Sequence, residues 1–428
     1  MSKDMTTPAN RPGPAPDPGG TGTAFVPGRP GSDTKPLSGY RVIEMCSTIA
    51  GPVCARLLAD FGAEVIKIEP PEGDAARNMG LQDQGESLYC ASMLRNKQTV
   101  CIDLKTGEGR KLVRELVAKA DFLVENFRAG TLERLGLGYE VLSQDNPGLI
   151  LVRISGYGQD GPYSHLPGYG AICEAIAGVR HMTGDPDRPP ARVALATTDY
   201  LTAVYAAFGA MLALEQRHRS GKGQVVDTAL YETAFSMMES YVPAYPRLGV
   251  VPQRQGPRLM NTAPNSLYRT RDDSYVLLAA NNDAIFRRLA GVLGHPEWAD
   301  DERYATQLAR GGRVEEIDEL VEAWTRQHDA LAIVEAMNTA GVPVAKVYTI
   351  ADIFADPHFA ARGMLQKLAH PRLGEVVLPG IVPKLSDTPG EIREPGHLLG
   401  EDTAAVLEKT LGIEPGRIDE LRRSGVVR

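Results

Sequence analysis

The first half of the chain alternates between short apolar runs rich in β-branched residues and longer amphipathic stretches. The short runs predict strands, and the longer stretches predict helices. Strands are expected over residues 40–45, 64–68, 122–125, 149–154 and 224–228, and helices over residues 50–61, 107–119 and 201–214. Strands that alternate with helices favour a parallel sheet covered by helices, so we expect an α/β fold.

The second half of the chain has a different pattern. Residues 242–264 are rich in Pro, Gly and Arg and have no apolar period, which is typical of a linker. Beyond this segment, strands are expected over residues 275–279 and 342–347, helices over residues 284–293, 314–327 and 331–340, and a final helix over residues 403–411.

The length and these patterns predict two domains. A chain of 428 residues is longer than one ordinary hydrophobic core supports. We expect a large α/β domain at residues 37–241, completed by residues 350–428, and a smaller α+β domain at residues 265–349, which follows the linker. Residues 1–36 contain almost no large apolar side chains. They should form a disordered tail, because such a segment cannot offset its ordering entropy.

Composition narrows the class of protein. Hydrophobic residues make up 43% of the chain and charged residues 23%, as in soluble globular proteins. A formal net charge of −8 argues against a sequence-independent contact with nucleic acid. No apolar run reaches the length of a membrane span and the N-terminus lacks a signal-peptide core, so we expect no membrane contact and a cytoplasmic location.

The sequence has no motif for a metal or a redox centre. The five cysteines are odd in number and scattered, and no two of them have the spacing of a metal knuckle. Most lie among apolar neighbours, which favours buried thiols. The eight histidines form no close pair. We therefore expect no bound metal.

Asp199 is the clearest candidate for chemistry. With Thr197 and Thr198 it stands where the long helix is expected to begin, and these residue types cap helices. The helix dipole favours an ionised carboxylate at this place. An ionised carboxylate on rigid structure can attack an activated carbonyl. The alternative is that Asp199 only caps the helix.

Several short motifs occur in the order and at the spacing of one known family. They are Ala-Gly-Pro at 50–52, Phe-Gly-Ala-Glu-Val-Ile-Lys-Ile-Glu at 61–69, Asn-Lys at 96–97, Ile-Asp-Leu-Lys at 102–105, Val-Glu-Asn-Phe at 124–127, Gly-Tyr-Gly-Gln-Asp-Gly-Pro-Tyr at 156–163 and Gly-Lys-Gly-Gln at 221–224. Each motif alone is weak. Together with Asp199, they make residues 37–411 resemble the class III CoA-transferase family, which includes formyl-CoA transferase and carnitine CoA-transferase.

The resemblance implies a fold, a ligand and a set of contacts. The fold is a Rossmann-like large domain with a smaller α+β domain, in a homodimer whose two chains interlock like rings. Coenzyme A and acyl-CoA are substrates, and no cofactor is bound permanently. The implied contacts with coenzyme A fall on Ile49, Ala50, Ile102, Lys105, Asn126, Phe127, Arg128 and Arg134. Amides at a helix start and guanidinium groups both suit a ligand that carries phosphates.

The reaction that the resemblance implies moves coenzyme A from an acyl-CoA thioester to a free carboxylic acid. Asp199 first forms a mixed anhydride with the acyl group and then a thioester with coenzyme A, and the incoming acid reverses these steps. A dicarboxylate such as succinate is one candidate acid. Arg258 and Arg271 could hold its second carboxylate, although both are equally consistent with surface positions.

The chain departs from the family pattern at three places. Gly170 stands where several relatives have an acidic residue, and Glu174 either compensates for this or faces solvent. Pro70 replaces an arginine that often follows the Ile-Lys-Ile-Glu strand. The segment 259–268 is shorter than the glycine run of formyl-CoA transferases. These departures leave the reaction class in place but speak against formate and oxalate as substrates.

The sequence gives less support to three other functions. One branch of the family racemises 2-methylacyl-CoA esters with a histidine and an aspartate, but its histidine falls on Tyr169 here, so the second base is missing. A non-catalytic subunit that binds coenzyme A would lack Asp199. An NAD-dependent dehydrogenase needs a glycine fingerprint between the first strand and helix, and residues 46–51 do not supply one.

Overall fold

Six parallel strands form the main sheet of the computed structural model, which describes residues 35–428. The strands are β1 (Arg41–Met45), β2 (Glu64–Glu69), β5 (Lys97–Cys101), β6 (Phe122–Glu125), β7 (Ile150–Ser155) and β8 (Val225–Ala229). Their order across the sheet is β5-β2-β1-β6-β7-β8. This is the order of a doubly wound sheet, whose topological switch point lies here between β1 and β6. The expected α/β fold with a parallel sheet is therefore confirmed.

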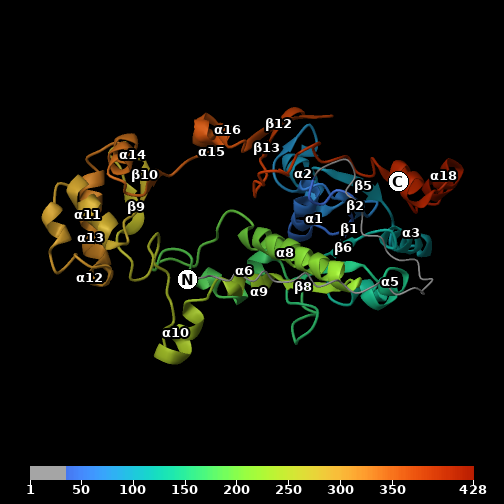
Figure 1. Cartoon of the computed structure of the whole chain (residues 1–428), viewed down its shortest axis with the longest axis horizontal. Helices are drawn as coiled ribbons and strands as arrows, with labels where there is room; N and C mark the ends of the chain where they lie inside the picture. The colour runs from blue at the N-terminus through green and yellow to red at the C-terminus, as the bar shows by residue number, and fades with distance from the viewer. Residues whose placement is uncertain (1–34) are drawn as a thin grey trace, which may run out of the picture.

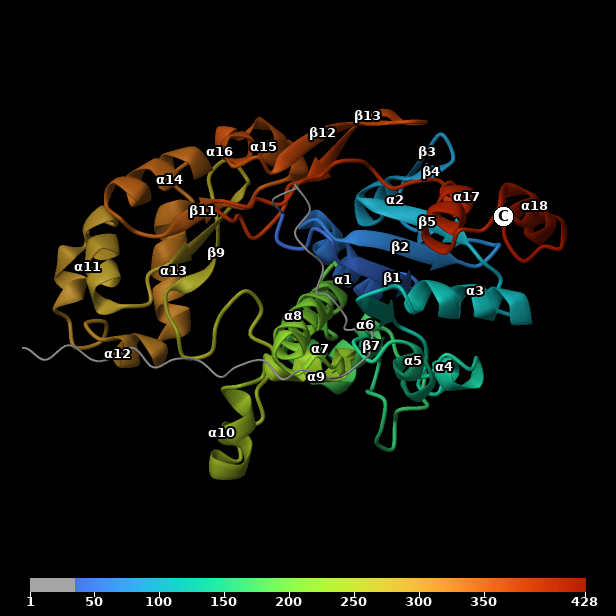
Figure 2. The ribbon, with the colours of Figure 1, turned by 45° about the vertical axis from the view of Figure 1, so that its right-hand side comes forward.

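Helices cover both faces of this sheet (Figures 1 and 2). Successive strand residues point to opposite faces, so Val42 packs into one core and Ile43 into the other. The first core lies under α1 (Ala50–Asp60) and α8 (Thr197–Ser220). The second lies under α3 (Gly107–Val117), α5 (Tyr139–Asp145) and α18 (Pro415–Arg423). Both faces of the sheet are thus buried. A ligand can therefore approach the sheet at the ends of its strands.

A separate antiparallel sheet has its own hydrophobic core. Its strands are β9 (Asn265–Arg269), β10 (Tyr275–Ala279) and β11 (Val344–Lys346), and it packs with α11 (Asp283–Val292), α13 (Val314–Thr325) and α14 (Ala330–Thr339). Figures 1 and 2 show this unit set apart from the six-stranded sheet. One connection arrives from α10 (Tyr241–Leu248) and another leaves through α15 (Ile350–Ala355) and α16 (Pro357–Ala361), so the chain passes twice between the two units.

The remaining elements are short. The helices are α2 (Leu88–Met93), α4 (Thr131–Arg134), α6 (Gly170–Ile176), α7 (Val179–Met182), α9 (Leu230–Ser236), α10 (Tyr241–Leu248), α12 (Gln307–Gly311), α15 (Ile350–Ala355), α16 (Pro357–Ala361) and α17 (Thr403–Val406). Two hairpins pair β3 (Gln82–Asp83) with β4 (Glu86–Ser87) and β12 (Leu365–His370) with β13 (Gly374–Pro379).

Three expectations from the sequence need correction. The predicted linker 242–264 is not wholly irregular, because α10 occupies its start. The helix expected at 403–411 stops being α-helical at Val406 and continues as a π turn, and it is not the last, because α18 follows. Strand β5 was missed because its sequence, Lys-Gln-Thr-Val-Cys, carries a charge at a position that proves to be buried.

The structure also bears on the expectations about cysteines, membrane spans, metal ligands and the N-terminal segment. All five cysteines are buried and free, as predicted. Within residues 35–428, no helix is both long and apolar enough to cross a membrane. The same part of the chain contains no group of three His, Cys, Asp or Glu side chains arranged as metal ligands. Of the predicted tail, residues 1–34 lie outside the described residues, whereas the Lys35 ammonium donates a hydrogen bond of 2.9 Å to the Pro389 carbonyl.

Candidate active site

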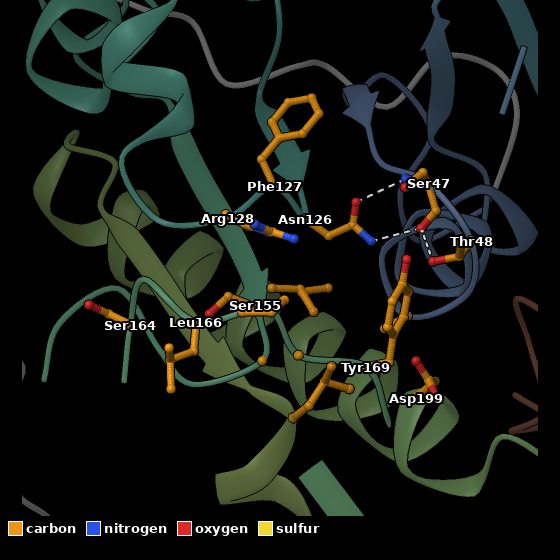
Figure 3. Close-up of a pocket in the computed structure, with 16 residues that line it drawn as sticks. Ser47, Thr48, Asn126, Phe127, Arg128, Ser155, Ser164, Leu166, Tyr169 and Asp199 are labelled. Carbon is orange, nitrogen blue, oxygen red and sulfur yellow. Dashed lines mark hydrogen bonds between the residues drawn. The ribbon is translucent and has the colours of Figure 1, made fainter. Parts of the chain in front are cut away.

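A cavity of about 200 Å³ opens where β1 and β6 end. This is the switch point of the sheet, where doubly wound proteins bind their ligands. Its wall is made by the turns after β1, β6 and β7, by the loop before α6 and by the start of α8 (Figure 3). The residues that line it are Ser47, Thr48, Ala50, Asn126, Phe127, Arg128, Ile154, Ser155, Gly156, Ser164, Leu166, Pro167, Gly168, Tyr169, Asp199 and Leu230.

Asp199 lies in the first turn of α8 and not at its cap. The capping position falls on Ala196, and no side chain caps the helix there. Asp199 is half-buried against the cavity wall. Burial raises the pKa of Asp199 to about 6, its own backbone N–H and Arg192 oppose the rise, and the negative charge of Glu174 adds to it. The carboxylate is therefore mostly ionised at neutral pH, as expected, yet more basic than an ordinary aspartate.

Gly170 makes room for the Asp199 carboxylate. A Cβ atom built on Gly170 would lie 2.0 Å from Asp199 Oδ2, much closer than any real contact. Any side chain at this place would therefore displace the carboxylate from the position it has here. Glu174, on the same helix as Gly170, does not face solvent: it is 7% exposed, and Arg180 Nε donates to it at 2.7 Å. Its charge acts on Asp199 through the low-dielectric interior.

The turn after β1 adopts a conformation that its residue type disfavours. Thr48 has φ +64°, a left-handed value that is a true outlier for a β-branched residue. The Thr48 N–H donates to Asp74 Oδ1 at 3.0 Å. The amide of Asn126 bonds both backbone groups of Ser47, accepting from its N–H at 2.9 Å and donating to its carbonyl at 2.8 Å. These bonds tie the turn after β1 to the turn after β6 (Figure 3).

The turn after β6 rests on a second set of buried charges. Glu125 Oε2 accepts from the Phe127 N–H at 2.7 Å, and its Oε1 accepts from Arg153 Nε at 2.6 Å. Arg153 also donates to Glu133 of α4, at 2.8 Å. Burial raises the pKa of Glu125 to about 7, although Arg153 and the Phe127 N–H oppose the rise.

The structure brings together five of the residues expected from the sequence: Ala50, Asn126, Phe127, Arg128 and Asp199 all line the cavity. The other four do not.

Ile49 is half-buried at the cap of α1 and packs against the core. Ile102 is fully buried, with its backbone bridged to Val427, so its side chain offers no surface to a ligand. The Lys105 side chain is 82% exposed and lies 3.6 Å from Glu72, and Arg134 donates to Thr131 at 2.8 Å. Lys105 and Arg134 follow β5 and β6, so they lie on the same edge of the sheet, outside the cavity.

Other residues of the cavity were not expected from the sequence. Tyr169 was noted only as the residue in place of a histidine, yet Figure 3 shows it beside Asp199 in the cavity wall. Ser155 is the last residue of β7, and Gly156 follows it and begins the Gly-Tyr-Gly-Gln-Asp-Gly-Pro-Tyr motif. That motif and the Pro167–Gly168 turn were the signals that could have found this wall, because glycine-rich turns after strands often approach ligands closely.

The two arginines considered for a second carboxylate are already paired. Arg258 Nε lies 2.7 Å from Asp318, and Arg271 Nη2 lies 2.7 Å from Asp329. Neither lines the cavity. Arg128 is the cationic residue among those that line it.

The known proteins that this chain resembles include a protein family and individual enzymes described as CoA-transferases. The family model described as CoA-transferase family III matches residues 37–403. Succinyl-CoA–D-citramalate CoA-transferase of Chloroflexus aurantiacus is 45% identical over 395 residues, which cover 92% of this chain and 98% of the relative. Succinate–glutarate CoA-transferase of Agrobacterium fabrum is 38% identical over 389 residues, covering 89% and 96%. The crystal structure of a CAIB/BAIF family protein from Brucella suis matches with a TM-score of 0.77 and 36% identity, covering 88% of this chain and 99% of that one.

The raised pKa of Asp199 predicts a pH-dependent cost to folding. The pKa is about 6 in the folded chain against an ordinary value of 3.8, so the folded state binds this proton more readily than the unfolded state. The cost is absent below the unfolded pKa and complete above the folded one. We expect Asp199→Asn to raise the free energy of unfolding at pH 7.5 by about 1–3 kcal/mol, at about 1.4 kcal/mol per pKa unit.

Urea denaturation at pH 7.5, 6 and 4.5 measures this difference. The gain should shrink as the pH falls through 6. Asp187→Asn, in an exposed loop, is the matched control and should change stability little at each pH. If Asp199→Asn raised the free energy of unfolding equally at all three pH values, the raised pKa of Asp199 would be contradicted.

Proposed function

The chain belongs to CoA-transferase family III, and from this membership we propose that it moves coenzyme A from succinyl-CoA or a similar thioester to a free dicarboxylic acid, with Asp199 as the covalent nucleophile. One observation carries the proposal most directly. The raised pKa makes Asp199 a stronger nucleophile than a surface aspartate, and the residue lies in the cavity at the switch point of the sheet.

In the first half of the proposed reaction, an Asp199 oxygen attacks the carbonyl carbon of the acyl-CoA. The C–S bond breaks, which leaves an aspartyl–acyl anhydride and coenzyme A thiolate. The thiolate then attacks the aspartyl carbonyl and expels the donor acid as a carboxylate. The product is a thioester between Asp199 and coenzyme A.

The second half runs these steps backwards with a different acid. The incoming carboxylate attacks the aspartyl thioester, releases the thiolate and forms a new anhydride. The thiolate attacks the acyl carbonyl of that anhydride, so the new acyl-CoA leaves and Asp199 is regenerated as a carboxylate. Each tetrahedral intermediate needs donors for its oxyanion. We assign this role to backbone N–H groups of the glycine-containing walls at Gly156 and Gly168.

The names of two relatives support dicarboxylates as substrates, because these enzymes use succinyl-CoA with D-citramalate and succinate with glutarate. Such acids need a cation for the carboxylate that does not react. Arg128 supplies positive charge inside the cavity, and none of the hydrogen bonds or ion pairs described for residues 35–428 involves its guanidinium. Arg258 and Arg271 are not assigned this role, since each is paired with a carboxylate.

Coenzyme A would lie along the carboxyl edge of the sheet. Ala50, Asn126 and Phe127 would contact the end near the thioester. Lys105 and Arg134, farther along the same edge, would meet the phosphates and the nucleotide. We no longer assign a side-chain contact to Ile102, because it is completely buried. No cofactor other than the substrate is part of the proposal.

The two alternatives within the family receive no support from the cavity. A 2-methylacyl-CoA racemase needs a second base opposite the aspartate, and none of the described residues that line the cavity is a histidine. A non-catalytic subunit would have no need of an aspartate whose burial works against folding.

We also propose the interlocked homodimer and the division into a large domain, a linker at 242–264 and a small domain at 265–349. The two connections between the units support a ring-shaped chain (Figures 1 and 2). An apolar row on α8 supports a partner surface: Val204, Phe208 and Leu212 are one helical turn apart, and each is more than half exposed, at 52%, 59% and 56%.

A charge placed on that row should hinder assembly of the dimer as the variant chains fold, because interlocked chains do not separate once they are folded. The chain has a mass of 46.2 kDa, so light scattering of the purified protein should give about twice that value. Phe208→Glu should shift the mass toward a single chain, because a buried carboxylate without a partner is costly. Leu331→Glu, also at an exposed apolar position, is the matched control. A parent that measures as a monomer would contradict the proposal.

The function is tested by supplying succinyl-CoA with D-citramalate, glutarate, propionate or formate and separating the thioesters by chromatography. We expect new thioesters with the dicarboxylates. We also expect a hydroxamate on the Asp199 peptide when succinyl-CoA and hydroxylamine are added without acceptor. Asp199→Ala should lower kcat by at least about 10⁴-fold, as loss of a nucleophile does elsewhere. An isomerised acyl-CoA formed without any acid would favour the racemase instead.

Gly170→Ala tests the placement of the nucleophile. The added methyl group overlaps Asp199 Oδ2, so the carboxylate must move away from its present position. We expect kcat to fall by about 10–100-fold, the usual result of displacing a reacting group by about 1 Å. Gly291→Ala, a helical position with open space around it, should leave kcat unchanged. A Gly170→Ala variant with parental kcat would show that Asp199 does not react from this position.

A further inference from the structure

Two fully buried lysines lie beneath the turn that follows β1. Lys67 belongs to β2 and Lys97 to the neighbouring β5, and neither side chain has any exposed surface. Both pair with Glu44 of β1: Lys67 Nζ lies 2.9 Å from Oε1 and Lys97 Nζ lies 2.7 Å from Oε2. One carboxylate thus holds two ammonium groups below the edge of the sheet where the cavity opens.

Both ammonium groups also hold backbone of the turn. Lys67 Nζ donates to the Cys46 carbonyl at 2.7 Å, and Lys97 Nζ donates to the Pro52 carbonyl at 2.6 Å. These two carbonyls stand at the two ends of the passage from β1 into α1. The buried charges therefore fix where that passage begins and where it ends.

Asp74 connects these charges to the middle of the turn. It comes from the loop after β2 and is 3% exposed. Its Oδ2 lies 2.8 Å from Lys67 Nζ, and its Oδ1 accepts from the N–H groups of Thr48 and Ala76 at 3.0 and 2.9 Å. Burial alone would raise the pKa of Asp74, but Lys67 and the two N–H groups lower it below its ordinary value. The carboxylate is thus held ionised and aimed at the Thr48 N–H.

The hydrogen bond from Thr48 stabilises a conformation that threonine avoids. At φ +64° the β-branched side chain is strained, and such strain persists only where surrounding groups enforce it. Thr48 itself lines the cavity, whereas Asp74 and Lys67 do not. The strained residue therefore faces the cavity, and the residues that hold it in this conformation lie behind the cavity wall.

We propose that Asp74, held by Lys67, is a positioning residue for coenzyme A: it keeps Thr48 in the left-handed conformation and so forms the wall before the ligand arrives. This inference rests on the proposed function, because coenzyme A is the ligand assigned to that wall. A wall formed in advance spares the ligand the cost of ordering it. The effect should therefore appear in binding and only weakly in the chemical step.

The test is a double-mutant cycle between Asp74→Ala and Thr48→Gly, with the dissociation constant of coenzyme A measured by calorimetry. Asp74→Ala in the parent should weaken binding by about tenfold or more, the equivalent of one charge-assisted hydrogen bond. In the Thr48→Gly background the same change should weaken binding by less than about threefold, because glycine adopts a positive φ without strain. In the transferase assay, Asp74→Ala should raise KM for the acyl-CoA far more than it lowers kcat.

Hydrogen exchange of the peptide that covers residues 46–52 gives a readout that needs no ligand. Asp74→Ala should speed its exchange in the free enzyme. Thr48→Pro serves where Asp74→Ala folds poorly, since proline forbids a positive φ and removes the N–H that Asp74 accepts, while it leaves the Asp74 and Lys67 side chains in place, and it should also weaken binding. Asp318→Ala is the control, because it removes a buried, ion-paired carboxylate of the small unit and should leave binding of coenzyme A unchanged.

The outcomes separate the two proposals. A parent that does not bind coenzyme A overturns the proposed function and this inference with it. A parent that binds, together with Asp74→Ala that binds equally well or loses as much affinity in the Thr48→Gly background, overturns the inference alone. The inference alone is also overturned if Asp74→Ala and Asp318→Ala weaken the binding of coenzyme A equally.

Discussion

A row of buried charges at the carboxyl edge of the parallel sheet is the constraint on which the candidate site depends. Glu44 pairs in register with Lys67 of the neighbouring strand, and Glu125 pairs with Arg153. Such pairs gain little over apolar side chains, because burying each charge costs several kcal/mol, yet the loss of one partner typically costs about 3–5 kcal/mol. Their value here is geometric: their remaining donors and acceptors are aimed at the backbone of the two turns that line the cavity.

The cavity lies between this wall and the carboxylate of Asp199, whose ionised form is disfavoured by burial. The Asn126 side chain links the turns after β1 and β6, so the wall near the switch point behaves as one piece. Asp199 comes from a different part of the chain, and burial raises the pKa of its carboxyl group to about 6. Each buried charge of the wall has a partner, whereas Asp199 forms no ion pair within residues 35–428, and burial makes its carboxylate more basic. A site that combines the two can hold a ligand firmly and still present a reactive group.

The sequence by itself determined the fold class and the identity of the key residue. Short apolar runs separated by amphipathic helices favour a parallel sheet buried on both faces, and the predicted strands at 40–45, 64–68 and 122–125 agree with β1, β2 and β6. The motif at the end of β6 pointed to Asn126, because residues there meet at one edge of a parallel sheet, and Asp199 was indicated by its place at the expected start of a long helix. Local pattern was insufficient for β5 and α18, where charged and other polar residues outnumber apolar ones and burial depends on partners from distant segments.

Only the tertiary structure decided which of these residues meet and in what environment. Ile102 sits in the same motif as Lys105, yet Ile102 is fully buried in a core that includes Val427 from the distant C-terminal segment, whereas the Lys105 side chain is exposed. The clash that makes Gly170 necessary arises between α6 and α8, and the partner of Thr48 lies 26 positions away at Asp74. Distances, desolvation and ion pairing are properties of groups brought together by folding, so the pKa of Asp199 and the strain at Thr48 cannot be read from local sequence.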